Sequence, residues 1–266
     1  MGDFLDVLAA TAWKSVKEGY YYCGGAEEKY HKRSLKNAIK EISNARAPII
    51  SEIKFASPSL GQLKPPGNIE SIAKSMIGAG AVGLSILTEP KHFLGSLENL
   101  IRARRSVEAP ILMKDIIVSK EQIESAHRVG ADAVLLIFAL FKRGHCEASL
   151  SEMIDYSHRR GLEVLLETHT PEEFRSALST DADMIGINNR DLRTLKVDLN
   201  VTRRILECFD RSEIGDRPII SESGIKSPED IRFLKKCGAD AFLVGSSIMT
   251  AENIVDFVSR LVNAYG

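Results

Sequence analysis

Eight short apolar runs, each followed by a longer charged segment of helical periodicity, constrain the fold of this chain more than any other feature. Successive runs start 21 to 34 residues apart, which leaves room for one helix in each interval. This alternation is typical of parallel β-α units. The runs are Ile49–Lys54, Val82–Leu87, Ile111–Lys114, Ala133–Ile137, Glu163–Glu167, Met184–Asn188, Pro218–Glu222 and Ala241–Val244.

Three of these runs are preceded by a Gly-Ala pair: Gly80-Ala81, Gly130-Ala131 and Gly238-Ala239. Glycine at such a position fits a helix end that turns into a strand. An open, doubly wound sheet would also alternate strands with helices, but the chain lacks a glycine-rich dinucleotide fingerprint. We therefore predict an α/β protein with a (β/α)8 (TIM) barrel over residues 49–266.

Residues 1–48 precede the first run and look helical in two pieces, which the Gly24-Gly25 pair separates. Their apolar residues, among them Phe4, Leu8 and Trp13, exceed what a solvated tail needs. We therefore predict an N-terminal helical extension that caps the barrel, so that residues 1–266 form a single domain. The adjacent tyrosines 20–22 face different ways on a helix, so packing explains them better than base stacking does.

The charge balance argues against a nucleic-acid or membrane partner. Lysine and arginine number 35 and aspartate and glutamate 36, so no global field favours a polyanion. The chain has no secretion signal and no apolar run long enough to span a bilayer. We expect a cytoplasmic monomer that acts on a small molecule, without nucleic acid or membrane.

Charged and polar residues end several of the predicted strands. In a barrel enzyme the chemistry lies at these carboxyl ends of the strands. Glu52 and Lys54 are two residues apart, so a strand directs both to one face and Ile53 to the other. A single charged residue at a strand end could simply be solvated at the rim of the barrel. Five strand ends of this type make that interpretation much weaker. The other four ends carry Lys114, Glu167, Asn188 and Glu222.

Enclosed charges of opposite sign must pair or shift their pKa values, because an isolated buried charge is strongly unfavourable. A cluster of lysines 54 and 114 with glutamates 52 and 167 would offer both proton donors and proton acceptors near neutral pH. Such a cluster requires no metal and no redox cofactor. We therefore expect general acid-base chemistry.

Small residues follow the last two strands, at Ser223-Gly224 and at Gly245-Ser246-Ser247. Their backbone N–H groups can converge on an anion, as in the usual phosphate site of these barrels. Ser57-Pro58-Ser59 adds a third hydroxyl-rich loop. Each loop alone could be a tight turn without a ligand, but the three loops together predict a phosphate site.

Seven segments resemble the indole-3-glycerol phosphate synthase family, in order and over nearly the whole chain from residue 49. The combination is specific, although no single segment is. The segments are SEIKFASPSLG (51–61), LSILTEPKHFLGS (84–96), ILMKDIIVSKEQI (111–123), LEVLLETHTPEE (162–173), IGINNRDLRTLKVDL (185–199), IISESGI (219–225) and FLVGSSIM (242–249).

The resemblance implies a decarboxylating and dehydrating ring closure in tryptophan biosynthesis. The substrate would be a phosphorylated anthranilate-ribulose conjugate, 1-(2-carboxyphenylamino)-1-deoxyribulose 5-phosphate, and the product indole-3-glycerol phosphate. Lys114 matches the family's general acid, and Lys54 and Glu167 match a second acid and a base. Glu52 and Asn188 would support them. Which lysine acts at which step stays open.

The resemblance also implies a set of substrate-binding residues. Arg190 matches a position near the substrate carboxylate, and Phe93 matches an aromatic wall residue. Ile116 stands where the family commonly has phenylalanine, which removes a ring that could stack on the anthranilate. The matched residues of the phosphate and substrate cradle are Ser57, Pro58, Glu222, Ser223, Gly224, Gly245 and Ser246.

Three alternatives stay open from the sequence. A Schiff-base aldolase would use Lys114 or Lys54 as a nucleophile, provided that burial lowered the pKa of its amine. A sugar-phosphate isomerase would share the phosphate loops but would not need two lysines and two glutamates. A non-catalytic barrel that binds a phosphorylated metabolite is the third, because a fold alone does not establish catalysis.

Overall fold

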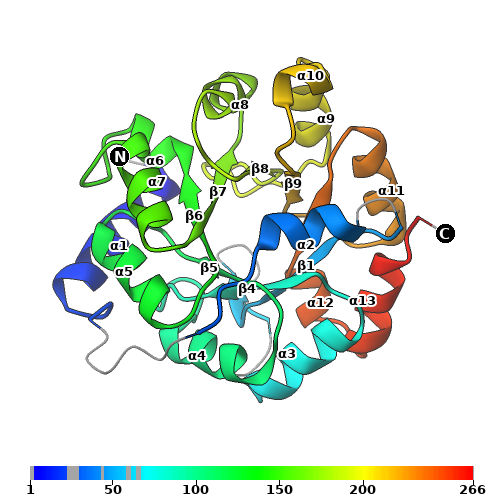
Figure 1. Cartoon of the computed structure of the whole chain (residues 1–266), viewed down its shortest axis with the longest axis horizontal. Coiled ribbons are helices and arrows are strands. Elements are labelled where there is room, and N and C mark those ends of the chain that lie inside the picture. Colours follow the sequence, from blue (N-terminus) through cyan, green and yellow to red (C-terminus); the bar gives the residue numbers. More distant parts are fainter. Residues whose placement is uncertain (1–2, 23–29, 43–44, 58–60, 64–66, 266) are drawn as a thin grey trace.

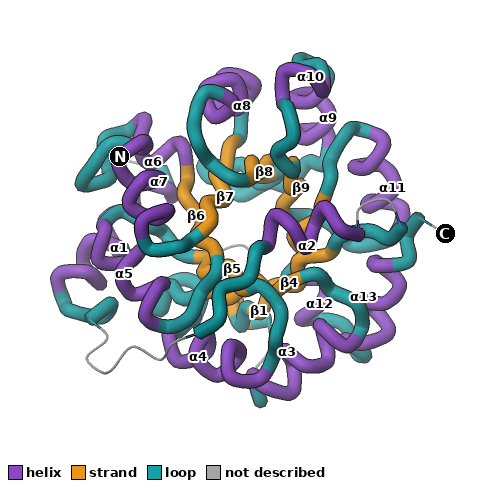
Figure 2. Tube along the Cα trace, in the orientation of Figure 1, coloured by secondary structure: helices purple, strands orange, loops and turns teal. Residues whose placement is uncertain are grey.

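Eight parallel strands close into a barrel inside a ring of helices (Figures 1 and 2), in the order β1-β10-β9-β8-β7-β6-β5-β4. The computed structural model describes residues 3–22, 30–42, 45–57, 61–63 and 67–265. The closed barrel of eight parallel strands confirms the prediction of a (β/α)8 fold. The barrel strands are β1 (Ile49–Ile53), β4 (Gly83–Leu87), β5 (Ile111–Lys114), β6 (Ala133–Ile137), β7 (Glu163–Thr168), β8 (Met184–Asn188), β9 (Ile219–Glu222) and β10 (Ala241–Val244).

The observed strands agree with the predicted runs to within one residue at each end. Glycines 80, 130 and 238, which precede β4, β6 and β10, have φ angles of +100°, +85° and +105°. This is the left-handed region that favours glycine where a helix ends. The Gly-Ala pairs therefore mark the helix-to-strand turns, as predicted. A short hairpin of β2 (Ala56–Ser57) and β3 (Gly61–Gln62) follows β1.

Hydroxyl side chains cap the amino ends of five of the helices outside the barrel. Ser96, Ser119, Ser149, Thr170 and Ser227 each accept a hydrogen bond from a backbone N–H of the first turn that follows. The helices outside the barrel are α3 (Ile69–Gly78), α4 (Leu97–Ser106), α5 (Lys120–Arg128), α6 (Phe138–Lys142), α7 (Leu150–Arg159), α8 (Pro171–Leu178), α9 (Asn200–Leu206), α10 (Arg211–Ile214), α11 (Pro228–Lys236), α12 (Ser246–Met249) and α13 (Ile254–Val262).

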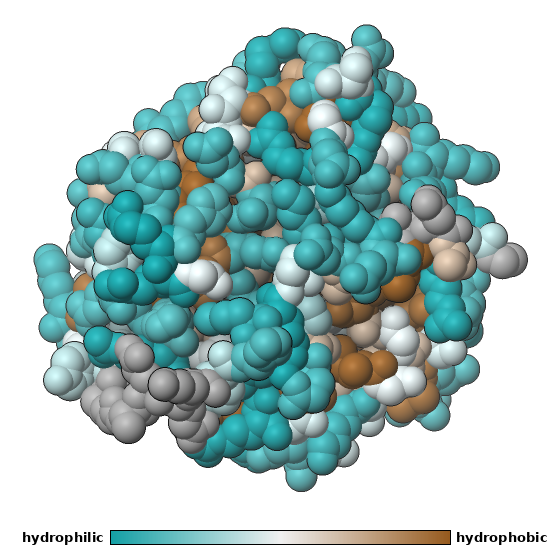
Figure 3. Space-filling model, in the orientation of Figure 1, coloured by the Kyte–Doolittle hydropathy of each residue, from teal (hydrophilic) through white to brown (hydrophobic). Residues whose placement is uncertain are grey.

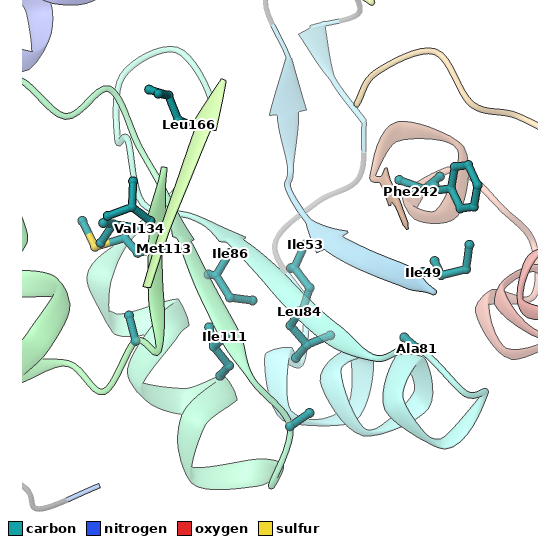
Figure 4. Close-up of a cluster of buried hydrophobic side chains, with 14 of the residues drawn as sticks. Ile49, Ile53, Ala81, Leu84, Ile86, Ile111, Met113, Val134, Leu166 and Phe242 are labelled. Atoms are coloured by element: carbon teal, nitrogen blue, oxygen red, sulfur yellow. The ribbon is translucent and has the colours of Figure 1, made fainter. Parts of the chain in front are cut away.

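The core has two layers because strand side chains alternate between the two faces. Ile53, Ile86 and Met113 belong to the layer between strands and helices, part of which Figure 4 shows. Ile50 and Leu243 belong to a second cluster that fills the barrel interior. Since Ile53 packs outward, its neighbours Glu52 and Lys54 are directed into the barrel, as the sequence predicts.

Two N-terminal helices cover opposite ends of the barrel. Helix α2 (Leu35–Ile42) lies across the opening at the amino ends of the strands (Figure 1), where the Glu163 carboxylate accepts hydrogen bonds from the N–H groups of Leu35 and Lys36. This face of the molecule is largely hydrophilic (Figure 3). Helix α1 (Phe4–Lys17) covers the other end, where the Trp13 indole donates to the carbonyl of His145 at 2.7 Å.

The Gly24-Gly25 pair lies outside the described residues, so its expected role as a helix break stays a prediction. Within the described part of the chain, none of the helices is both long and apolar enough to cross a bilayer.

Candidate active site

A pocket of about 560 Å³ opens at the carboxyl ends of the strands, under helix α1. It contains nearly all the residues that the sequence predicts for the site. Glu222 lies beneath its floor and bonds to a residue that lines it, whereas Pro58 is outside the described residues. The predicted residues that line the pocket are Glu52, Lys54, Ser57, Phe93, Lys114, Glu167, Asn188, Arg190, Ser223, Gly224, Gly245 and Ser246.

Glu52 and Lys54 form an ion pair on one side of the pocket. The Lys54 ammonium lies 2.7 Å from the Glu52 carboxylate, and the Ser85 hydroxyl lies 3.5 Å from the same carboxylate. Burial alone would raise the pKa of Glu52, but the positive charges of Lys54 and Lys114 outweigh burial and lower that pKa. Glu52 therefore stays ionised and holds the Lys54 ammonium in place.

Lys114 lies at the centre of three carboxylates. Its ammonium donates a 2.7 Å hydrogen bond to Glu222 and is 3.8 Å from both Glu52 and Glu167. Burial would lower the pKa of Lys114, but these three negative charges outweigh burial and raise it well above its usual value. Lys114 is therefore protonated at neutral pH and can act as a proton donor.

Glu222 is fully buried, and its Oε1 atom has no hydrogen-bond partner among the described residues. Burial raises the pKa of Glu222 to about 7, because the neighbouring negative charges also oppose ionisation while only Lys114 favours it. Gly186 of β8 makes room for this carboxyl group: a Cβ atom there would lie 2.2 Å from Oε1. Gly186 carries no local signal in the sequence, because the close approach joins two separate strands.

Gly245 at the end of β10 has a similar role beside Glu52. A Cβ atom at this position would lie 2.3 Å from Oε1 of Glu52. The sequence analysis placed Gly245 only in the phosphate cradle. The structure adds that a larger residue there would displace the Glu52 carboxylate.

The loops after β9 and β10 bring small residues to the wall of the pocket next to β1. Ser223 and Gly224 have φ angles of +69° and +86°, and Ser223 holds this conformation although it carries a Cβ atom. The Asn189 amide secures the turn by donating to the Glu222 and Ser223 carbonyls. Gly245 and Ser246 begin the short helix α12 on the same side. Small residues at these positions leave the backbone N–H groups accessible from the pocket, which is the kind of surface that suits a small anion.

Apolar residues form the rest of the wall. Phe93 and Ile116 line the pocket together with Phe4 and Leu8 of helix α1. The sequence analysis interpreted Phe4 and Leu8 only as cap residues, although their apolar character was the available signal. It missed Leu195 and Val197 of the loop after β8 altogether, since that loop carries no periodic pattern.

Asn188 and Arg190 lie at the end of β8, where the Asn188 side-chain oxygen accepts a hydrogen bond from the Arg190 N–H at 3.0 Å. The Arg190 guanidinium donates to the Leu195 carbonyl at 2.9 Å. His169 is 3.0 Å from the Arg190 carbonyl and 3.9 Å from Glu167, so it contacts the site from its edge. The amide and guanidinium groups thus face the pocket from a single strand end.

The closed barrel and the lysine-glutamate pocket at its carboxyl end define a (β/α)8-barrel enzyme with acid-base side chains. Among solved structures, the thiamine phosphate pyrophosphorylase from Pyrococcus furiosus is similar, with a TM-score of 0.57 and 18% identity over 86% of this chain and 96% of that one. An N-acetylmannosamine-6-phosphate 2-epimerase from Clostridium perfringens has the same TM-score at 13% identity, over 84% and 93%. These likenesses concern the fold.

The sequence comparisons are more specific. The model of the family described as indole-3-glycerol phosphate synthase matches residues 16–261. The chain is 44% identical to the indole-3-glycerol phosphate synthase of Methanocaldococcus jannaschii, over 88% of this chain and 85% of the relative. It is 43% identical to that of Aquifex aeolicus, over 80% of each. The chain belongs to the indole-3-glycerol phosphate synthase family.

Proposed function

We propose that this chain converts 1-(2-carboxyphenylamino)-1-deoxyribulose 5-phosphate into indole-3-glycerol phosphate, with loss of CO₂ and water, in tryptophan biosynthesis. Membership of the family supports the reaction. The observation in the structure that carries it is the Lys114 ammonium surrounded by three carboxylates within one pocket. This arrangement supplies the proton donors and acceptors that ring closure and dehydration need.

Ring closure places negative charge on an oxygen atom. The aromatic carbon that bears the carboxylate attacks the ribulose ketone, and Lys114 protonates the developing alkoxide. Departure of CO₂ then returns the electron pair to the ring and restores its aromaticity. We assign Lys114 to this step because it is held protonated at the centre of the pocket.

Dehydration requires a second acid and a base. Lys54 protonates the hydroxyl group that leaves as water, and Glu167 accepts the proton that the ring system must lose to form the indole. Glu52 holds Lys54 through their 2.7 Å ion pair, and Asn188 orients the substrate from the end of β8. The family resemblance implies these roles, and the position of each group in the pocket supports them.

The remaining residues bind the two ends of the substrate. Arg190 faces the carboxylate of the anthranilate, and Phe93 packs against its ring. Glu222 contributes through its hydrogen bond to Lys114. The phosphate lies in the cradle of small residues, which we assign to Ser57, Pro58, Ser223, Gly224, Gly245 and Ser246.

The electrostatics of Lys114 do not favour the aldolase alternative. A Schiff-base lysine must be neutral to attack a carbonyl, so its pKa should be lowered. The carboxylates around Lys114 raise the pKa of this amine instead. A protonated amine suits a general acid, not a nucleophile.

We place the enzyme in the cytoplasm, as a monomer whose partner is the small phosphorylated substrate. The nearly balanced charge of the chain supports the absence of a nucleic-acid partner.

The direct test is to supply the carboxyphenylamino-deoxyribulose phosphate to the purified chain. We expect indole fluorescence to appear together with one equivalent of CO₂. A borohydride treatment during turnover should trap no covalent adduct. Trapping would indicate an aldolase, a product that keeps its carboxyl group would indicate an isomerase, and binding without turnover would indicate a phosphometabolite-binding barrel.

A further inference from the structure

Two of the three adjacent tyrosines after helix α1 reach the catalytic end of the barrel. Tyr21 is 1% exposed and Tyr20 is partly buried, whereas Tyr22 is 75% exposed. The rings of Tyr20 and Tyr21 pack edge to face, with centroids 4.9 Å apart. The sequence interpretation assigned these residues to packing alone. Their hydroxyl groups indicate a more specific role.

The Tyr21 hydroxyl bonds to the residue that follows Lys114. It lies 3.0 Å from each carboxylate oxygen of Asp115. The same carboxylate accepts hydrogen bonds from the Thr88 hydroxyl and, at 2.7 Å, from the N–H of Ile116. Asp115 is 1% exposed, so the bonds form in a medium of low dielectric where each is strong.

The Tyr20 hydroxyl secures the neighbouring strand end. It donates to the carbonyl of Thr88 at 2.9 Å and accepts from the N–H of Leu97 at 3.3 Å. The N–H of Thr88 in turn donates to the carbonyl of Lys114 at 3.1 Å. The two hydroxyl groups therefore connect the N-terminal extension to the carboxyl ends of β4 and β5, next to Lys114.

We propose that Tyr20 and Tyr21 are positioning residues that fix the backbone around Lys114. This inference rests on the proposed function of Lys114 as general acid. A proton donor must lie within hydrogen-bond reach of the reacting oxygen, and a misplacement of about 1 Å can lower the rate by about 10²-fold. The tyrosines act through Lys114 and do not contact the substrate.

The test uses adjacent tyrosines as a matched set. Tyr21→Phe removes the hydroxyl that bonds to Asp115 and keeps the ring, and Tyr22→Phe removes an exposed hydroxyl one residue away. We expect Tyr21→Phe to lower kcat by about 10-fold with KM changed by less than about twofold. Tyr22→Phe should leave both constants unchanged. Tyr20→Phe, which loses the bond to Thr88, should lower kcat in the same direction and gives a second test if Tyr21→Phe folds poorly.

The pH profile provides a readout that a purely structural role would not move. Burial raises the pKa of Asp115 to about 7, against the hydrogen bonds from Thr88, Ile116 and Tyr21 that favour its ionised form. Tyr21→Phe removes one of these donors, so the pKa of Asp115 should rise further. The acid limb of kcat against pH should then move by about half a unit toward higher pH.

Other titratable groups near Asp115 are the same in both variants. Glu89 from the loop after β4, Tyr20 and the adjacent Lys114 face the region of Asp115, and Glu52, Glu167 and Glu222 surround Lys114. A shift in Tyr21→Phe that is absent in Tyr22→Phe therefore reports on the Tyr21 hydrogen bond.

Two results would overturn the positioning role. One is a Tyr21→Phe enzyme whose kcat and acid limb match those of Tyr22→Phe. The other is a Tyr21→Phe enzyme that loses only thermal stability and keeps wild-type turnover at temperatures where it is folded. A wild-type chain that does not turn over the substrate would contradict the proposed function instead, and the parallel wild-type assay identifies that case.

Discussion

The two ends of the barrel both bury charge, but they do so differently. At the amino end, Arg104 and Asp132 form a 2.7 Å ion pair with both side chains 1% exposed. Arg104 also donates to the carbonyls of Val107 and Ala109, and Asp132 accepts from the N–H groups of Arg33 and Ile111. Each charge of this saturated pair is neutralised by the other and has further hydrogen-bond partners.

At the carboxyl end, by contrast, one ammonium faces three carboxylates. Lys114 bonds to Glu222 and lies near Glu52 and Glu167, and Glu222 has an oxygen atom without a hydrogen-bond partner among the described residues. A saturated pair holds its protonation state, whereas an unbalanced cluster has pKa values that a substrate can shift. The balance of partners, not burial, therefore separates structural charge from catalytic charge.

Backbone strain follows the same division. The non-glycine residues with positive φ in the described part of the chain are Leu94, Leu195 and Ser223. They lie in the loops that follow β4, β8 and β9, at the carboxyl end. Such conformations persist where the surrounding structure enforces them, often at functional sites. Strain and unbalanced charge therefore coincide at one end of the barrel.

The largest expected effect comes from Lys114→Ala at the carboxyl end. We expect kcat to fall by about 10³-fold, because the proposed proton donor to the alkoxide is removed. The barrel should still form, because the pKa of Glu222 is already raised and this carboxyl group can take up a proton once its counter-charge is removed. Turnover by indole fluorescence and far-UV circular dichroism measure the two properties. Wild-type turnover in this variant would remove Lys114 from the mechanism.

Arg104→Ala removes the cation of the buried ion pair at the amino end. It leaves the Asp132 carboxylate buried without its partner, so we expect the free energy of unfolding to fall by about 3 kcal/mol. The kcat of the folded fraction should stay within about twofold of wild type, because the pair is remote from the pocket. Urea denaturation and turnover below the transition check both. A variant as stable as wild type would show that the saturated pair does not stabilise the fold.

The titration of Glu222 at the carboxyl end should make the stability of the fold depend on pH. The pKa of Glu222 is raised from 4.5 to about 7, so the folded state binds this proton more tightly than the unfolded state does. The stability from this group is present below pH 4.5 and lost as pH rises through 7. Between pH 5 and 8, wild type should lose about 2 kcal/mol relative to Glu222→Gln, which does not titrate. Urea denaturation measures the free energy of unfolding of both proteins at each pH. The same difference between wild type and Glu222→Gln at pH 5 and at pH 8 would contradict this prediction.

The sequence predicted the barrel because its determinants are local. The alternation around Ile53 and the Gly-Ala pairs are patterns of neighbouring residues, and each run appears as a strand. It also predicted that the charged residues at the strand ends form one site, since a closed barrel gathers those ends in one place.

The sequence did not predict features that join distant segments. The pair of Arg104 with Asp132, the space that Gly186 leaves for Glu222 and the bond from Tyr21 to Asp115 each depend on the packing of separate elements. No local periodicity encodes such contacts. Phe4 and Leu8 were recognised as apolar, but their place in the pocket depends on where helix α1 lies.

The most direct measurement compares two isosteric substitutions, Glu167→Gln at the carboxyl end and Asp132→Asn at the amino end, by kcat and thermal unfolding. Both replace a buried carboxylate by an amide. We predict that Glu167→Gln lowers kcat by about 10²-fold or more and changes the unfolding temperature little. Asp132→Asn should lower the unfolding temperature and keep wild-type turnover below it. A Glu167→Gln enzyme with wild-type kcat, or a larger loss of kcat in Asp132→Asn, would contradict the assignment of chemistry to the unbalanced end.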